Sequence, residues 1–286
     1  MHPSILHIQE PISLSKFIYF PTGILGQYVK LIWTSQGIPD FQYERIIPDG
    51  CNTLLFNLSD DPIFSISENT RKAHRDIAAI GVMTRFAKIL YEKPAQEHQQ
   101  LGVIFQTGAA GLLFNPFIGD LKSTALNNDE IQIPHFNEWY EKLREMKQPQ
   151  QRIVFMADQF LQVIQQKSSS ATGAYFLDYL KKNIHLSVKD LATKSGYTEQ
   201  HLNRMVKKHA GVNVKSLQKV LRINRAMNQL TRSQGPLRLS DLAYDLQYFD
   251  QAHFIHDLKS ITGMTPGQIH HALQVGPLQT ERVLYH

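Results

Sequence analysis

Two stretches in the C-terminal part of the chain carry side chains suited to bonding with bases and phosphates. Read as helices, each gathers its apolar residues on one face and its polar residues on the other. Arginine pairs with guanine, asparagine and glutamine pair with adenine, and lysine neutralises phosphate. The candidate residues are Thr198, Gln200, His201, Asn203, Arg204, Lys207 and Lys208 in the first stretch, and Gln251, His253, His256 and Lys259 in the second. Such faces favour double-stranded DNA as the partner, and a merely solvated helix face is the alternative.

The two stretches belong to an internal repeat, which covers residues 187–211 and 239–263. Asp190-Leu-Ala192 matches Asp241-Leu-Ala243 at an offset of 51 residues, and the offset becomes 52 after one gained residue. The further matches are Tyr197 with Tyr248 and Gln200 with Gln251 at the first offset, and Leu202 with Phe254, Lys207 with Lys259 and Gly211 with Gly263 at the second. Each copy predicts a short helix, a turn and an amphipathic helix, which is the helix-turn-helix pattern.

Capping residues mark where the helices of this part begin. Ser187 and Asp190 form a capping box, Thr198 can cap the next helix, and Thr265 precedes a proline at the first helical position. Between the two copies, apolar spacing predicts one long helix from Val214 to Leu230. A helical solenoid is the rival architecture, but two copies separated by a long helix are too few for one.

Charge divides the chain in the same way as these patterns. Of the 286 residues, residues 1–170 carry 15 Lys/Arg and 17 Asp/Glu, and residues 171–286 carry 15 Lys/Arg and 8 Asp/Glu. A basic part joined to a nearly neutral part suggests a polyanion partner. The polar, Ser-rich stretch 165–173 reads as a linker. We therefore predict two domains, residues 1–168 and residues 169–286.

The N-terminal part mixes strand and helix signals. Gln27–Trp33, Thr53–Leu58 and Gly102–Gln106 are predicted as strands, and the Pro48-Asp49-Gly50 stretch as a turn. From Phe136 onward the apolar spacing becomes helical. The predicted fold is α+β, with a mainly β N-terminal domain that ends in helices and an all-α C-terminal domain.

The C-terminal ~110 residues resemble the AraC/XylS family of bacterial transcription regulators. The motifs are DLA…SGYTEQHLNRMVKKHAG, LRINRAMNQL and DLA…YFDQAHFIHDLKSITGMTP. The resemblance implies two helix-turn-helix units joined by a long helix, with both recognition helices in adjacent major-groove segments. The family usually places a small residue, mostly glycine, in the turn before the second recognition helix, whereas this chain has Gly196 in the first turn and Gln247 in the second.

More weakly, TGILGQYVKLIWTSQG, ERIIPDGCNTLLFNL and GVIFQTGAAGLLFNPFIGDL resemble the cupin-like N-terminal domains of one branch of that family. Such domains imply sensing of an effector or oligomerisation. The expected partners are double-stranded DNA, a small-molecule effector, RNA polymerase if the chain activates transcription, and a second copy of the chain. Trp33, Tyr43, Phe56 and Phe105 could line the effector pocket, or they could form the core of the β domain.

A cupin-type metal enzyme with a degenerate helical domain is the alternative function. His74, His98 and His135 lie in polar or loop-like contexts and form no recognisable ligand set, and the single Cys51 cannot build a multi-cysteine zinc site. We therefore expect no enzyme activity, no metal and no cofactor. No apolar run reaches the ~18 residues of a membrane span, and no signal peptide is recognised, so the chain is expected in the cytoplasm.

Overall fold

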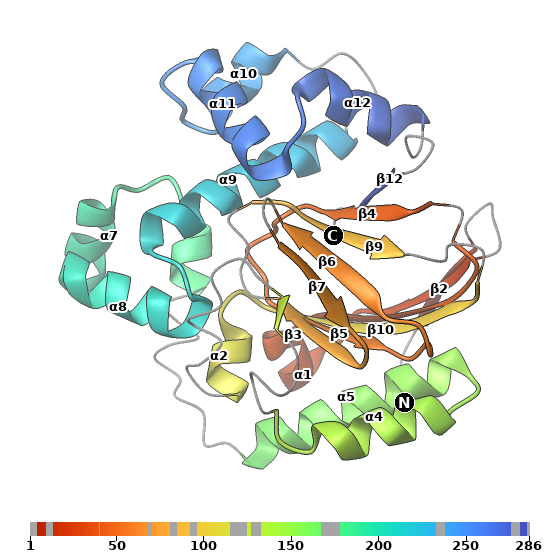
Figure 1. Ribbon diagram of the computed structural model, residues 1–286. Helices are drawn as coiled ribbons and strands as arrows, with labels where there is room; N and C mark the ends of the chain where they lie inside the picture. The colour runs from red at the N-terminus through yellow and green to blue at the C-terminus, as the bar shows by residue number, and fades with distance from the viewer. Residues whose placement is uncertain are drawn as a thin grey trace.

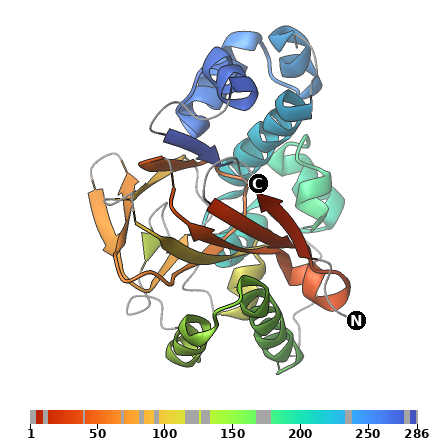
Figure 2. The same cartoon turned by 90° about the vertical axis from the view of Figure 1, so that its right-hand side faces the viewer.

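The computed structural model describes residues 5–9, 14–39, 41–67, 70–80, 85–91, 96–114, 125–126, 133–166, 178–232, 238–275 and 281–284. A β domain is followed by a helical part that covers one side and one end of it (Figures 1 and 2). This arrangement confirms the predicted α+β fold with a mainly β N-terminal domain and a helical C-terminal domain. The predicted linker lies largely outside the described residues.

The β domain consists of two facing sheets. The larger has the order β1-β2-β3-β10-β5-β8-β11, with bounds Ile5–Gln9, Leu14–Tyr19, Val29–Gly37, His98–Phe105, Thr53–Asn57, Ile77–Ile80 and Ala125–Leu126. The smaller has the order β12-β4-β9-β6-β7, with bounds Glu281–Leu284, Tyr43–Ile46, Ala87–Tyr91, Ile63–Ser67 and Thr70–His74. Neighbouring strands are antiparallel, except that β12 runs parallel to β4. The last described strand of the chain therefore returns to the N-terminal sheet.

Strand alternation explains how the larger sheet is buried on both faces. Successive side chains of a strand point to opposite faces. Accordingly Leu31 and Trp33 pack toward the smaller sheet, while Ile32 between them packs on the other side. The same alternation separates Leu55 from Leu54 and Phe56. The second face is covered by helices of the N-terminal domain, with Trp139 and Phe160 among the buried side chains.

Those covering helices include α1 (Gly23–Tyr28), α4 (Phe136–Glu145) and α5 (Pro149–Gln166), and α2 (Ala109–Leu113) lies beside them. In both views α4 and α5 lie beneath the larger sheet (Figures 1 and 2). The helical pattern predicted from Phe136 onward is confirmed. The strand predicted over Gln27–Trp33 is wrong at its start, because residues up to Tyr28 belong to α1 and the strand begins at Val29.

The helical part contains α7 (Val188–Ser195), α8 (Glu199–Ala210), α9 (Val214–Arg232), α10 (Leu239–Asp245), α11 (Gln251–Thr262) and α12 (Pro266–Val275). It has two separate apolar cores, one for each predicted helix-turn-helix unit. The long helix α9 serves both, since Val214 and Leu217 belong to the first core and Val220 and Met227 to the second. A single rigid element therefore joins the two units (Figure 1).

Candidate DNA-binding surface

The two units use the same capping geometry at the start of their second helices. The His201 backbone N–H donates to Thr198 Oγ1 at 3.1 Å, and the His253 backbone N–H donates to Asp250 Oδ1 at 2.7 Å. Each side chain satisfies one of the otherwise unpaired N–H groups of a helix N-terminus. Because the caps are Thr198 and Asp250, the offset between the copies is already 52 residues at the helix start.

This register corrects one match made from the sequence. The gained residue is Phe249, which lies in the turn between Tyr248 and the cap Asp250. Gln200 is therefore the second helical residue of α8, whereas Gln251 is the first of α11, so these two are not equivalent. The equivalent polar pairs are His201 with His253, Arg204 with His256 and Lys207 with Lys259.

The turn before each second helix has the same backbone shape. Gly196 has φ 73° and Gln247 has φ 58°, so both are in the left-handed region. The next residue closes each turn in the same way, because the Tyr197 N–H donates to Ala192 O at 3.1 Å and the Tyr248 N–H to Ala243 O at 2.9 Å. Gln247 thus adopts the conformation that glycine adopts with least strain.

The exposed face of α8 presents Gln200, Arg204, Lys207 and Lys208. His201 is half-buried because its ring stacks on Tyr197, with ring centroids 4.7 Å apart and planes inclined by 15°. Arg204 Nη2 lies 3.1 Å from His201 Nδ1. The stack and this contact orient the guanidinium, which can then present its other N–H groups outward.

Asn203 has a different role from its neighbours. Its Oδ1 accepts from the Val214 N–H at 3.1 Å, and its Nδ2 donates to Glu199 O at 3.1 Å. The side chain therefore caps the start of α9 from α8, and its amide is occupied within the protein. Sequence reasoning had no signal for this contact, because it joins residues eleven positions apart across a turn.

The exposed face of α11 presents Gln251, His253, His256 and Lys259. Beneath it lies Asp257, which is buried at 5% exposure and pairs with Lys219 Nζ at 2.7 Å. A buried carboxylate is costly unless it is paired. The ion pair also ties α11 to α9 and offsets a negative charge close to the face that is expected to meet phosphates.

The β domain contacts the C-terminal ends of α8 and α11. At α11, the Phe86 N–H donates to Ile261 O at 2.7 Å and Arg45 Nη1 donates to Thr262 O at 3.1 Å. At α8, α2 approaches so closely that a Cβ on Gly111 would lie 2.5 Å from the His209 carbonyl oxygen.

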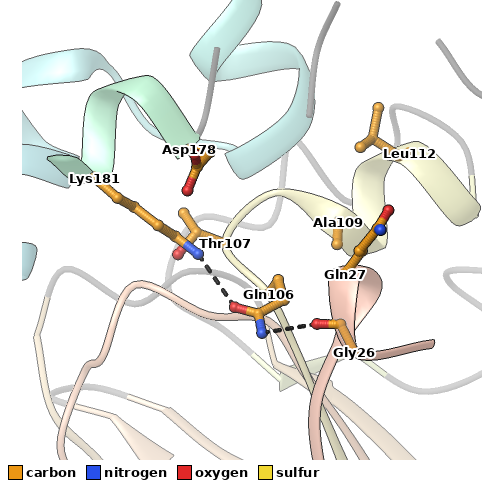
Figure 3. A pocket seen from close by; sticks show the side chains of 8 residues that line it. All are labelled: Gly26, Gln27, Gln106, Thr107, Ala109, Leu112, Asp178 and Lys181. Carbon is orange, nitrogen blue, oxygen red and sulfur yellow. Dashed lines mark hydrogen bonds between the residues drawn. The ribbon is translucent and has the colours of Figure 1, made fainter. Parts of the chain in front are cut away.

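A cavity of about 350 Å³ lies where α1, α2 and the helical part meet. It is lined by Gly26, Gln27, Gln106, Thr107, Ala109, Leu112, Asp178 and Lys181. Gln106 bridges the two sides, because its Oε1 accepts from Lys181 Nζ at 3.3 Å and its Nε2 donates to Gly26 O at 3.1 Å (Figure 3). Burial lowers the pKa of the Lys181 ammonium.

The four aromatic residues suggested for an effector pocket do not line this cavity. Phe56 and Phe105 are fully buried in the core between the larger sheet and the helices, while Trp33 is buried in the core between the two sheets. Tyr43 is half-buried, with Lys88 Nζ 5.6 Å from its ring centroid. The rings lie in different parts of the β domain. An effector pocket formed by them stays a prediction.

The three histidines weighed as metal ligands also lie apart in the fold. His74 Nε2 is 2.8 Å from Ser65 Oγ on the smaller sheet, His98 packs edge-on against Tyr91, and His135 precedes α4. In the part of the chain that the structure describes, no three His, Cys, Asp or Glu side chains are grouped as metal ligands. Among those same residues, no helix combines the length and apolarity needed to cross a membrane.

Two capped helix-turn-helix units on one long helix, each with an exposed polar face, define a helix-turn-helix DNA-binding protein. Residues 191–272 match a family model described as a helix-turn-helix domain, and residues 18–127 match one described as a domain of unknown function, DUF6597. The resemblance found in the motifs is confirmed: the C-terminal part is an AraC-type helix-turn-helix domain. The chain is a DNA-binding transcription regulator with an N-terminal β domain.

Solved structures with similar chains include ToxT from Vibrio cholerae and the C-terminal domain of AraT, a response regulator from Geobacillus stearothermophilus. ToxT is 13% identical with a TM-score of 0.47, over 92% of this chain and 100% of that chain. The AraT domain is 21% identical with a TM-score of 0.34, over 37% of this chain and 88% of that chain. None of the curated proteins matches the chain in sequence.

Proposed function

We propose that the chain reads a two-part DNA site, with α8 and α11 entering adjacent major-groove segments on one face of the duplex. The observation that carries this proposal is the equivalence of the two helices in register, cap and turn. Counted in residues from its cap, each helix presents a histidine, then an arginine in α8 or a second histidine in α11, and then a lysine at the same positions. Two helix faces that only contact solvent would not need the same order of side chains.

The connecting helix supports the same reading. At 19 residues, α9 is about 28 Å long. Successive major-groove segments on one face of DNA lie about 34 Å apart. A rigid element of this length, with one unit packed at each end, is suited to holding two recognition helices one turn of DNA apart.

Within this proposal the side chains divide into two roles. Gln200, His201 and Arg204 would contact base edges in the first segment, and Gln251, His253 and His256 in the second. Lys207, Lys208 and Lys259 would contact phosphates, with Thr198 at the phosphate-facing helix start. Asn203 is assigned to positioning, because its amide already caps α9.

The β domain is proposed to sense a small polar effector in the cavity beside α2. Two observations support this role. The lining residues come from both domains, and α2, which contributes Ala109 and Leu112, is packed against α8 through Gly111. A ligand that moves α2 would therefore act directly on a recognition helix. Homodimerisation, and contact with RNA polymerase in an activator, complete the proposal.

The test is selection of bound duplexes from a random library by the full chain at ~150 mM salt, where nonspecific phosphate binding is weakened. The proposal expects a motif in two parts whose centres are about one helical turn apart. The same selection with Arg204→Ala should lose information in one part, and with His256→Ala in the other. A palindromic pair of motifs would indicate a homodimer.

A motif with one part would limit base reading to one unit and contradict the two-part site. Enrichment of no sequence, in a chain that still binds DNA weakly, would contradict sequence-specific recognition as a whole.

A further inference from the structure

Phe249 is the most exposed large apolar side chain of the described residues, at 95% exposure. It is also the residue by which the second repeat exceeds the first, inserted between Tyr248 and the helix cap Asp250. Full exposure of an aromatic ring forfeits the stabilisation of roughly 1.5–3 kcal/mol that burial of such a side chain supplies. The ring therefore contributes little to the fold at the place where it stands.

The usual structural role for an apolar residue just before a cap is already filled. Such a residue packs against the fourth residue of the helix and fixes the entry angle of the chain. In the second unit that fourth residue is Phe254, and the ring packed on it is Tyr248, with centroids 5.4 Å apart. Arg222 covers Tyr248 further, 4.9 Å from its ring centroid. The packing of Tyr248 on Phe254 is thus kept in spite of the inserted residue, and Phe249 lies outside this contact.

The location of Phe249 brings it toward the ligand of the proposed function. The N-terminal residues of a recognition helix are those that contact base edges in the major groove. Phe249 is adjacent to the cap of α11, at the end of the helix opposite the β-domain contact at Ile261 and Thr262. Phe249 therefore precedes the helix N-terminus that would enter the major groove in the proposed function.

We propose that Phe249 is a specificity-determining residue that packs against the C5-methyl group of a thymine in the segment read by α11. The thymine methyl is the one apolar group on the major-groove edge of the bases, and an exposed phenylalanine is a suitable contact for it. This inference rests on the proposed function and extends it. The first unit has no equivalent ring, because its turn lacks the extra residue.

The experiment uses the full chain and its selected duplex. Each thymine of the α11 segment is replaced in turn by deoxyuridine, which removes only the methyl group. Dissociation constants are measured for the native chain, for Phe249→Ala and for Phe20→Ala. Phe20 is the matched control, since its ring is also exposed, at 56%, but lies in the β domain.

One deoxyuridine position should weaken binding of the native chain about four-fold, the effect of withdrawing one buried methyl group. Phe249→Ala should bind the thymine duplex more weakly by a similar factor or more and should no longer respond to that deoxyuridine. Phe20→Ala should behave as the native chain does.

Equal sensitivity of the native chain and Phe249→Ala to every deoxyuridine would overturn the assignment. Unchanged DNA affinity of Phe249→Ala with loss of transcription control would also overturn it, and would point to a protein partner at this ring and at the exposed Tyr244. If the native chain bound no sequence specifically, the proposed function itself would fail. Specific binding with no response to deoxyuridine would remove only the role of Phe249.

Discussion

Arg204 and Lys207 lie on the same exposed face of α8, but their side chains differ in what they can distinguish on DNA. The guanidinium of Arg204, oriented by His201, can bond to two acceptors of one guanine. The ammonium of Lys207 attracts any phosphate. Arg204→Ala should therefore cost ~1–3 kcal/mol on the selected site and little on an unrelated duplex, whereas Lys207→Ala should weaken both alike. Titration of each variant with both duplexes would distinguish these roles, and equal losses for Arg204→Ala on both would refute base reading.

Cys51 allows a second prediction at this scale. Its side chain is buried, and burial, with the nearby Asp49 carboxylate, raises the pKa of the thiol to about 12. Because the thiolate is the reactive form, the folded chain should not react with a thiol reagent at pH 8. One thiol per chain should react after unfolding in guanidinium. Rapid labelling of the folded chain would show that this region opens.

At the scale of elements, the turn before α11 is strained where the turn before α8 is not. A non-glycine residue in the left-handed region costs ~1–2 kcal/mol, and Gln247 has φ 58° while being exposed. Gln247→Gly should therefore raise the free energy of unfolding by about 1 kcal/mol, measured by urea denaturation. Gly196→Gln in the first turn, at φ 73° with open space around it, is the reverse experiment and should lower it. No change in either variant would mean that these turns carry no strain.

Elements were predicted from sequence where a local pattern determines them. The caps Thr198 and Ser187, the long helix α9 and the helices from Phe136 were all recognisable from spacing and capping residues. The boundary between α1 and the strand that contains Trp33 was not recognisable, because the six residues of α1 and the start of that strand are similar in composition. The contact of Asn203 with Val214 could not be predicted for another reason: the fold brings the two residues together, and this leaves no periodic signal in the sequence.

The register of the repeat shows the same limit. Sequence identity favoured Gln200 opposite Gln251, whereas the hydrogen bonds of Thr198 and Asp250 place the extra residue earlier, at Phe249. The contacts between the β domain and the helical part could also not be predicted from the sequence, since Arg45 and Thr262 are 217 residues apart. Long-range pairs of this kind depend on the whole fold.

At the scale of the whole molecule, the close approach of α2 to α8 should be sensitive to one methyl group. A Cβ at position 111 would meet backbone atoms of His209, which cannot rotate away. Gly111→Ala should therefore lower the melting temperature, with a cost of ~1–3 kcal/mol from overpacking. Gly267→Ala is the control, because a Cβ at that helical position meets nothing within 4 Å and alanine favours the helix. Equal melting temperatures for the two variants would mean that the domains are not in contact at α2.

In the proposed function, one chain reads two DNA segments that α9 holds one turn apart. The most direct measurement is the affinity of the full chain for its selected site with about five base pairs inserted between the two parts. That insertion turns the second segment to the opposite face of the duplex, since one helical turn is about 10 base pairs. Affinity should then fall to that of a duplex with the second part scrambled. Affinity equal to that of the unaltered site would contradict the proposed function.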